Sequence, residues 1–117
     1  MATVVIKRVY EPPTKSDGKR YLVDRLWPRG LRKADAALDD WWKDLAPSPP
    51  LRTWFAHDPK RFSEFKRRYK TELRTNPLLN ATAKSLGAGK VTLLYAAKDS
   101  QVNHAVVLAE ALRRLTA

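Results

Sequence analysis

Residues Lys90–Ala97 spell KVTLLYAA, a continuous apolar run that begins just after Gly87 and Gly89. A run of this kind is typical of a strand in the middle of a sheet, covered on both faces. Because successive side chains of a strand point to opposite faces, we expect both Leu93 and Leu94 to be buried. The rest of the fold is expected to assemble around this strand.

Patterns on either side predict the other elements. Alternating residues favour strands over Thr3–Tyr10 and Arg20–Trp27, and less clearly over Asp39–Leu45, which leads into an extended proline connector. Apolar spacings of three and four predict a short helical turn and three helices, at Leu31–Ala37, Lys60–Arg74, Pro77–Ser85 and Gln101–Leu115. The predicted class is α/β, a small mixed sheet of about four strands with helices packed on it, forming one domain over residues 1–117.

Helix ends are marked by capping residues. Asp58 followed by Pro59 predicts the start of the basic helix, and its apolar stripe consists of Phe62, Phe65, Tyr69 and Leu73. Ser100 is the expected cap of the last helix.

The segment Val23–Gly30, VDRLWPRG, places charges where a buried strand should have none. If the strand continues through it, Asp24 and Arg25 each lie on a largely apolar face, where a charge needs a partner. Pro28 and Gly30 then bend the chain and hold Arg29 at the strand's exit. Two interpretations stay open: a structural ion pair between Asp24 and an arginine, or a site for an anion.

A second candidate site follows the central strand, at the start of the last helix. Ligands of open α/β sheets bind beyond the carboxyl ends of strands, and a helix N-terminus attracts anions. If the two strands run parallel, their ends meet in one pocket; if antiparallel, Arg29 lies at the far edge from Lys98. The alternative is that Asp99 or Ser100 only caps the helix while His104 packs. We predict a pocket for a phosphate- or carboxylate-bearing ligand, formed by Asp24, Arg25, Arg29, Arg52, Lys98, Asp99, Asn103 and His104.

The formal net charge of +11 favours polyanionic partners. The basic helix therefore offers a second function, nucleic-acid binding without sequence specificity through Lys60, Arg67, Arg68, Lys70 and Arg74. Its structural alternative is a solvated face opposite an apolar stripe. A homo-oligomer with some of Trp41, Trp42 and Trp54 in its interface stays open, because tryptophan is enriched in interface hot spots. Core packing is the usual role of such residues.

Several classes of function are excluded by composition. Without cysteine the chain has no disulfide, thiolate metal site or cysteine nucleophile. Two distant histidines make no metal motif, and no glycine-rich phosphate loop is present, so we expect no metal and no cofactor. Neither a signal peptide nor a membrane-spanning run is visible, so we expect a cytoplasmic protein. Acids, bases and hydroxyls are present, but no pattern specifies a reaction: Asp24, His57, Asp99, His104, Ser48 and Ser100.

Three motifs carry a family resemblance: VDRLWPRG, LAPSPPLRTWFAHDP and LLYAAKDSQVNHAVVL, in this order along the chain. Together they resemble the bacterial YeaO-like proteins, part of the class called domain of unknown function 488. The resemblance covers nearly the whole chain. It implies a small single-domain cytosolic protein, and it supplies neither a substrate nor a catalytic residue.

Overall fold

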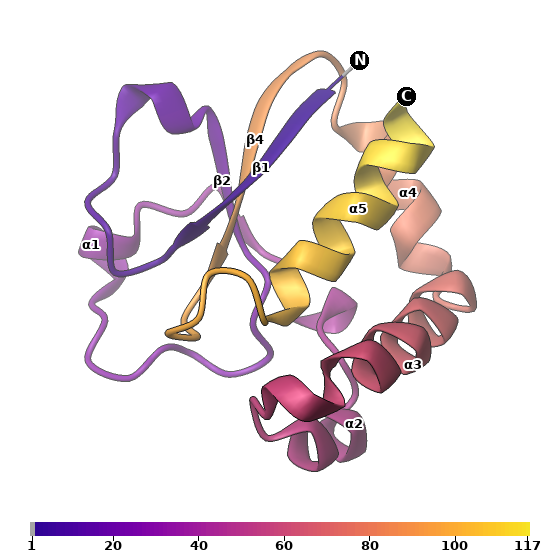
Figure 1. Cartoon of the computed structure of the whole chain (residues 1–117). Coiled ribbons are helices and arrows are strands. Elements are labelled where there is room, and N and C mark those ends of the chain that lie inside the picture. Colours follow the sequence, from indigo (N-terminus) through magenta and orange to yellow (C-terminus); the bar gives the residue numbers. More distant parts are fainter. Residues whose placement is uncertain (1) are drawn as a thin grey trace.

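The computed structural model describes residues 2–117, which form a sheet with helices packed against it (Figure 1). The strands lie in the order β1-β4-β2-β3, and each neighbouring pair is parallel. They are β1 (Ala2–Arg8), β2 (Lys19–Leu22), β3 (Asp40–Trp41) and β4 (Gly89–Tyr95). The predicted α/β fold with a small sheet is confirmed, but the sheet is wholly parallel rather than mixed.

The connections explain the parallel arrangement. Parallel strands need crossovers of roughly a dozen residues or more, and the loop after β1 carries the chain back to the edge where that strand began. This loop contains a 3-10 turn, Lys15–Asp17. β1 and β2 therefore form no hairpin, and β4, from the far end of the chain, lies between them.

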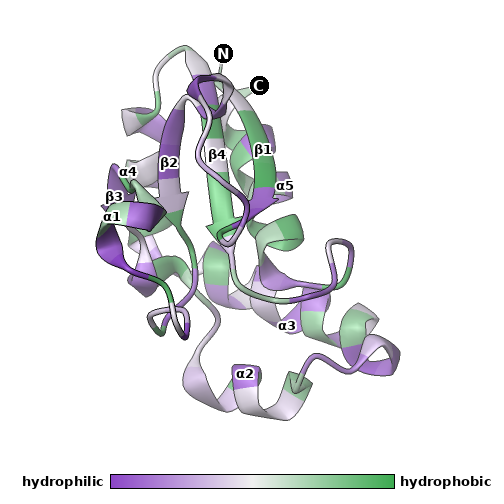
Figure 2. Ribbon diagram, turned by 90° about the vertical axis from the view of Figure 1, so that its left-hand side faces the viewer, coloured by the Kyte–Doolittle hydropathy of each residue, from purple (hydrophilic) through white to green (hydrophobic). Residues whose placement is uncertain are grey.

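β4 is the centre of the sheet, as its apolar run predicts. It pairs with β1 on one side and β2 on the other, and both Leu93 and Leu94 are completely buried. Figure 2 shows β4 in hydrophobic colours between its two neighbours. Leu93 joins the main core under the helices, whereas Leu94 packs with Val9 and Leu22 on the opposite face. The prediction of a covered interior strand is confirmed.

The helices are α1 (Lys33–Ala36), α2 (Pro49–Phe55), α3 (Phe62–Arg74), α4 (Pro77–Ser85) and α5 (His104–Thr116). The main core lies between the sheet and the helices α2 to α5, which occupy one side of the sheet in Figure 1, while the short helix α1 lies on the other. The predicted stripe of the basic helix is buried at Phe65, Tyr69 and Leu73. The buried hydroxyl of Tyr69 donates to the Leu45 carbonyl, so its polar end is satisfied.

Three local predictions are corrected. The strand expected at Asp39–Leu45 is only β3, followed by a 3-10 turn, Lys43–Leu45. The proline connector is extended only to Ser48, which caps α2, because prolines fit the first helical turn, where no N–H partner is needed. The last helix begins at His104 and is capped by Asn103, not Ser100. Asn103 Oδ1 accepts the Val106 N–H.

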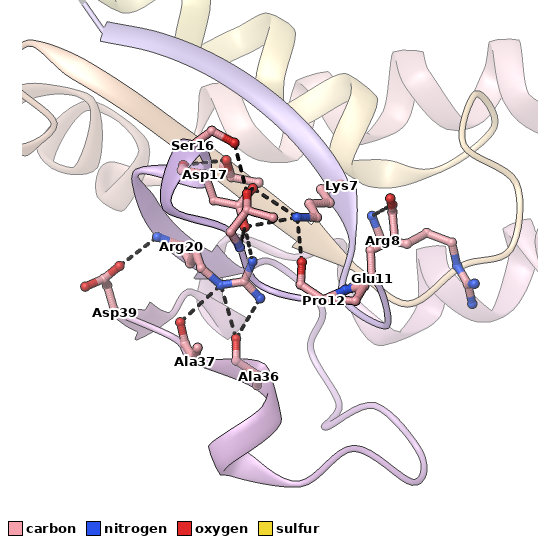
Figure 3. Close-up of polar contacts among 12 residues, drawn as sticks. Lys7, Arg8, Glu11, Pro12, Ser16, Asp17, Arg20, Ala36, Ala37 and Asp39 are labelled. Atoms are coloured by element: carbon pink, nitrogen blue, oxygen red, sulfur yellow. Dashed lines mark hydrogen bonds and ion pairs between the residues drawn. The ribbon is translucent and has the colours of Figure 1, made fainter.

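A buried ion cluster holds the loop after β1 against the sheet (Figure 3). The Asp17 carboxylate accepts hydrogen bonds from Lys7 Nζ, the Thr14 N–H and hydroxyl, and Arg20 Nη1. Arg20 also donates to the carbonyls of Ala36 and Ala37. Burial alone would raise the pKa of Asp17, but these hydrogen bonds outweigh it and hold that pKa well below its usual range.

Replacing Asp17 with alanine should lower the free energy of unfolding by about 3–5 kcal/mol, because the buried Arg20 guanidinium loses its counter-charge. Urea denaturation measures this loss. Asp35→Ala is the matched control, since the pair between Asp35 and Arg32 is exposed and contributes less than about 1 kcal/mol. Equal losses of stability in the two variants would show that the buried pair of Asp17 contributes no more than the exposed pair of Asp35.

The same cluster predicts a pH dependence. Because folding lowers the pKa of Asp17, its contribution to stability is complete above the ordinary aspartate pKa of about 4 and is lost as the pH falls below it. The unmodified protein should therefore lose more stability between about pH 4 and pH 2 than Asp17→Ala loses. Parallel pH profiles of the two proteins would count against this role.

Candidate functional site

The carboxyl ends of β2 and β4 lie at the same edge of the sheet because the strands are parallel. The pairing continues one residue beyond β2, where the Val23 N–H donates to the Leu94 carbonyl at 3.0 Å. Asp24 follows Val23 directly, and Ala96 follows Tyr95, the last residue of β4. Both strands point toward α2, which lies beyond this edge in Figure 2. This is the edge where open α/β sheets bind ligands.

A pocket of about 540 Å³ opens at this edge. Its lining is mostly apolar, and two aromatic rings of the core, Phe55 and Phe65, stack with centroids 4.1 Å apart. The other apolar lining residues are Leu26, Ala46, Pro47, Ala96 and Ala97. The charged or titratable ones are Asp24, Arg25, Arg52, His57, Lys98, Asp99 and His104. Because β2 and β4 are parallel, their carboxyl ends adjoin one pocket, which is the arrangement expected for parallel strands.

Asp24 connects three segments of the chain at the carboxyl ends of β2 and β4. Its Oδ2 accepts the Ala96 N–H at 3.2 Å, and its Oδ1 lies 2.9 Å from His104 Nε2. His104 Nε2 also lies 3.0 Å from the Val23 carbonyl oxygen. Both neighbours of Nε2 are acceptors, so this nitrogen carries the proton. The predicted pairing of Asp24 with an arginine is wrong: its partner is His104, which α5 brings from elsewhere in the chain.

The bond geometry leaves one oxygen of Asp24 without a donor. The His104 N–H points at the Val23 carbonyl, and no donor among residues 2–117 makes a well-directed hydrogen bond to Asp24 Oδ1. When His104 is protonated, the short distance makes the pair an ion pair. His104 Nδ1 makes no hydrogen bond within the same described residues.

Arg25 has a structural part in this site. Its guanidinium donates from Nε to the Pro47 carbonyl at 3.2 Å and from Nη2 to the Ala46 carbonyl at 3.1 Å. These bonds tie the chain that leads into α2 to the end of β2. Arg25 therefore shapes one wall of the pocket, and two nitrogens of its guanidinium are already engaged.

Three other basic side chains lie around the pocket without partners. Arg52 comes from α2, His57 from the turn that follows α2, and Lys98 from the loop after β4. All three are exposed, and none of their side chains makes a hydrogen bond or ion pair within residues 2–117. Unlike Arg25, these side chains therefore take no part in holding the described fold together by hydrogen bonds.

The loop between β4 and α5 is held by its own polar residues. Asp99 Oδ1 accepts the N–H groups of Gln101 and Val102, and Asn103 Nδ2 donates to the Asp99 carbonyl. Asn103 is fully buried as the cap of α5 and does not line the pocket. Its contribution is to position the start of the helix, and thereby His104.

Arg29 also lies outside the pocket lining. The chain leaves the sheet after Val23, so the following turn carries Arg29 to the surface, where its carbonyl accepts the Tyr10 hydroxyl. The predicted site residues that do line the pocket are Asp24, Arg25, Arg52, Lys98, Asp99 and His104.

The titratable residue of the pocket lining that is missing from the predicted set is His57. Asp58 does cap the following turn, accepting the Lys60 N–H, as the sequence indicates. The chain reaches that cap through two successive left-handed residues, Ala56 with φ 48° and His57 with φ 57°. Neither is glycine, and such residues cost about 1–2 kcal/mol each. No local sequence signal marks this turn, because left-handed ends are normally recognised by glycine or asparagine.

Ala56→Gly should raise the free energy of unfolding by about 0.5–1 kcal/mol, because glycine adopts a φ of 48° without a Cβ clash. Urea denaturation provides the measurement. In Ala81→Gly, the same substitution lies in the exposed middle of α4 and should lower stability by about 1 kcal/mol. Destabilisation by both substitutions would show that the turn is not strained.

The basic face proposed for nucleic acid is partly neutralised. Arg67 and Arg68 both bind Glu64, and Lys66 and Lys70 lie about 4 Å from Glu110. The paired side chains remain exposed or half-buried, whereas Lys60 and Arg74 make no ion pair in the described part of the chain. This pattern matches a solvated helix face more closely than a continuous row of free charges.

Residues 2–117 contain no cluster of three or more histidine, cysteine, aspartate or glutamate side chains suited to a metal ion. Nor do they contain a helix whose length and apolarity would let it cross a membrane.

The fold and the pocket define a wholly parallel α/β protein with a charged rim at the carboxyl ends of its strands. A family model described as "Inactive DUF488-N3 subclade" matches residues 3–117. Uncharacterized protein Rv3073c of Mycobacterium tuberculosis (strain ATCC 25618 / H37Rv) is 45% identical over 109 residues, covering 93% of this chain and 92% of the relative. Uncharacterized protein YeaO of Escherichia coli (strain K12) is 44% identical over 110 residues, covering 93% of this chain and 96% of the relative.

The chain therefore belongs to the DUF488 family of YeaO-like proteins, as the three motifs implied. No solved structure matches it significantly.

Proposed function

We propose that the pocket binds a small ligand carrying a phosphate or carboxylate group. The observation that carries this proposal is the position of Arg52, His57 and Lys98, whose side chains surround one pocket and lack partners within residues 2–117. Elsewhere, Arg67 and Arg68 of α3 are paired with Glu64. A cavity of about 540 Å³ lies in the range of small-molecule sites.

Asp24 and His104 also line the pocket and support the ligand there. Asp24 and the Val23 carbonyl hold the proton of His104 on Nε2, which leaves Nδ1 for the ligand. Nδ1 accepts a hydrogen bond when the ring is neutral and donates one to an anion when the ring is charged. Asp24 thus orients a histidine rather than the arginine expected from the sequence.

The proposal is limited to binding. The family model's description contains the word "inactive", which favours a binding pocket over a catalytic one. The pocket lining has no serine, threonine or cysteine to serve as a nucleophile, and the Ser48 hydroxyl lies elsewhere, donating to Glu72. The Asp24–His104 pair alone does not define a reaction.

Phosphate or acetate should raise the melting temperature of the protein above that in chloride at equal ionic strength, because a ligand of the folded state stabilises it by mass action. Arg52→Ala should weaken the apparent affinity about tenfold or more, the loss expected for one charge-assisted hydrogen bond. Arg29→Ala is the control, since it removes an equal charge from an exposed residue outside the pocket. Equal weakening in the two variants would mean that only net charge matters.

His57→Asn should leave the protein folded, because asparagine enters the left-handed region readily, but should remove most of its thermal response to phosphate. The comparison is Ala56→Gly, which changes the neighbouring left-handed residue and keeps the imidazole. We expect Ala56→Gly to retain the phosphate response. A full response in His57→Asn would remove this side chain from the site.

A further inference from the structure

The pocket is more apolar than an inorganic anion requires. Its deep wall is the stacked pair Phe55 and Phe65, which are buried and continuous with the main core. Ala96 and Ala97, just beyond β4, add small apolar side chains, and Leu26 adds one that is 59% exposed. A phosphate or acetate ion alone would leave the accessible apolar surface of this lining, that of Leu26 above all, against water, which is unfavourable.

The charged groups occupy different positions from the apolar ones. Arg52, His57 and Lys98 are exposed, so they lie at the mouth of the pocket, whereas the phenylalanines lie at its base. Both acidic residues of the lining accept backbone N–H groups, Asp24 that of Ala96 and Asp99 that of Gln101. Arg25, Arg52 and Lys98 outnumber these two carboxylates, so the net charge around the apolar cavity is positive.

We infer that the ligand is a flat, apolar organic acid: an aromatic body that fills the base of the pocket and one acidic group, carboxylate or phosphate, held at the rim. This inference rests on the proposed function and adds the body to the acidic group. Small-molecule pockets commonly have this division, with apolar walls for the bulk of the ligand and a few polar groups that set its orientation. The stacked phenylalanines suit a flat ring better than a branched chain.

The first experiment separates the body from the acidic group. Melting temperatures are compared, at equal concentration and ionic strength, with 2-naphthoate, 2-naphthyl phosphate, 2-naphthamide, acetate and inorganic phosphate. We expect the naphthoate or the naphthyl phosphate to raise the melting temperature well above the shifts from acetate and inorganic phosphate, and above that from the uncharged amide. The two naphthyl acids distinguish a carboxylate ligand from a phosphate ester.

The second experiment uses variants that change one part of the pocket each. Lys98→Ala should reduce naphthoate affinity about tenfold or more without affecting the response to the amide. Leu26→Ser should reduce affinity for naphthoate but not for acetate. Leu115→Ser is its matched control, since Leu115 is also an exposed leucine, at 47%, and lies outside this pocket.

The outcomes distinguish this inference from the proposed function. If acetate and inorganic phosphate match the naphthyl acids, the apolar body contributes nothing and the inference is overturned, while the anion pocket stands. If the amide matches naphthoate, the acidic group contributes nothing and both are overturned. If none of the anions shifts the melting temperature, the proposed function fails and the inference fails with it.

Discussion

The parallel pairing of β2 with β4 is the constraint on which the candidate site depends. It places the ends of two strands, which lie far apart in the sequence, at one edge of the sheet, where Val23 still bonds to Leu94. In an antiparallel pair, Asp24 and Ala96 would lie at opposite ends of the strands and could not share a hydrogen bond. Every charged residue of the pocket is positioned relative to this edge, either by following a strand or by belonging to a helix packed beyond it.

Asp24 and Arg25 connect this edge to its surroundings in different ways. Asp24 joins the end of β2 to the end of β4 and to the first residue of α5. Arg25 joins the same strand end to the backbone before α2. Adjacent residues of opposite charge thus fix different segments around the pocket, and they do not pair with each other. The exposed basic residues around the pocket, Arg52, His57 and Lys98, take no part in these hydrogen bonds.

The accuracy of the sequence predictions varies with how local their causes are. α4 begins and ends where its proline and apolar spacing indicate, because its cap Asn76 lies next to it in the chain. α2 was missed because three prolines suggest an extended chain, although two of them fit a first helical turn after the Ser48 cap. Arg52 was included in the predicted site and His57 was not, since the turn that carries His57 contains neither glycine nor asparagine.

The sequence by itself determined the class of fold, the central position of β4, the buried stripe of α3 and the family to which the chain belongs. These follow from the spacing of apolar residues and from motifs, which are properties of short segments. Only the tertiary structure decided that all strands are parallel, that His104 rather than an arginine lies beside Asp24, and that Arg29 does not line the pocket. Those outcomes depend on which distant segments pack together, and the free energy that selects among such packings comes from the whole core rather than from any one segment.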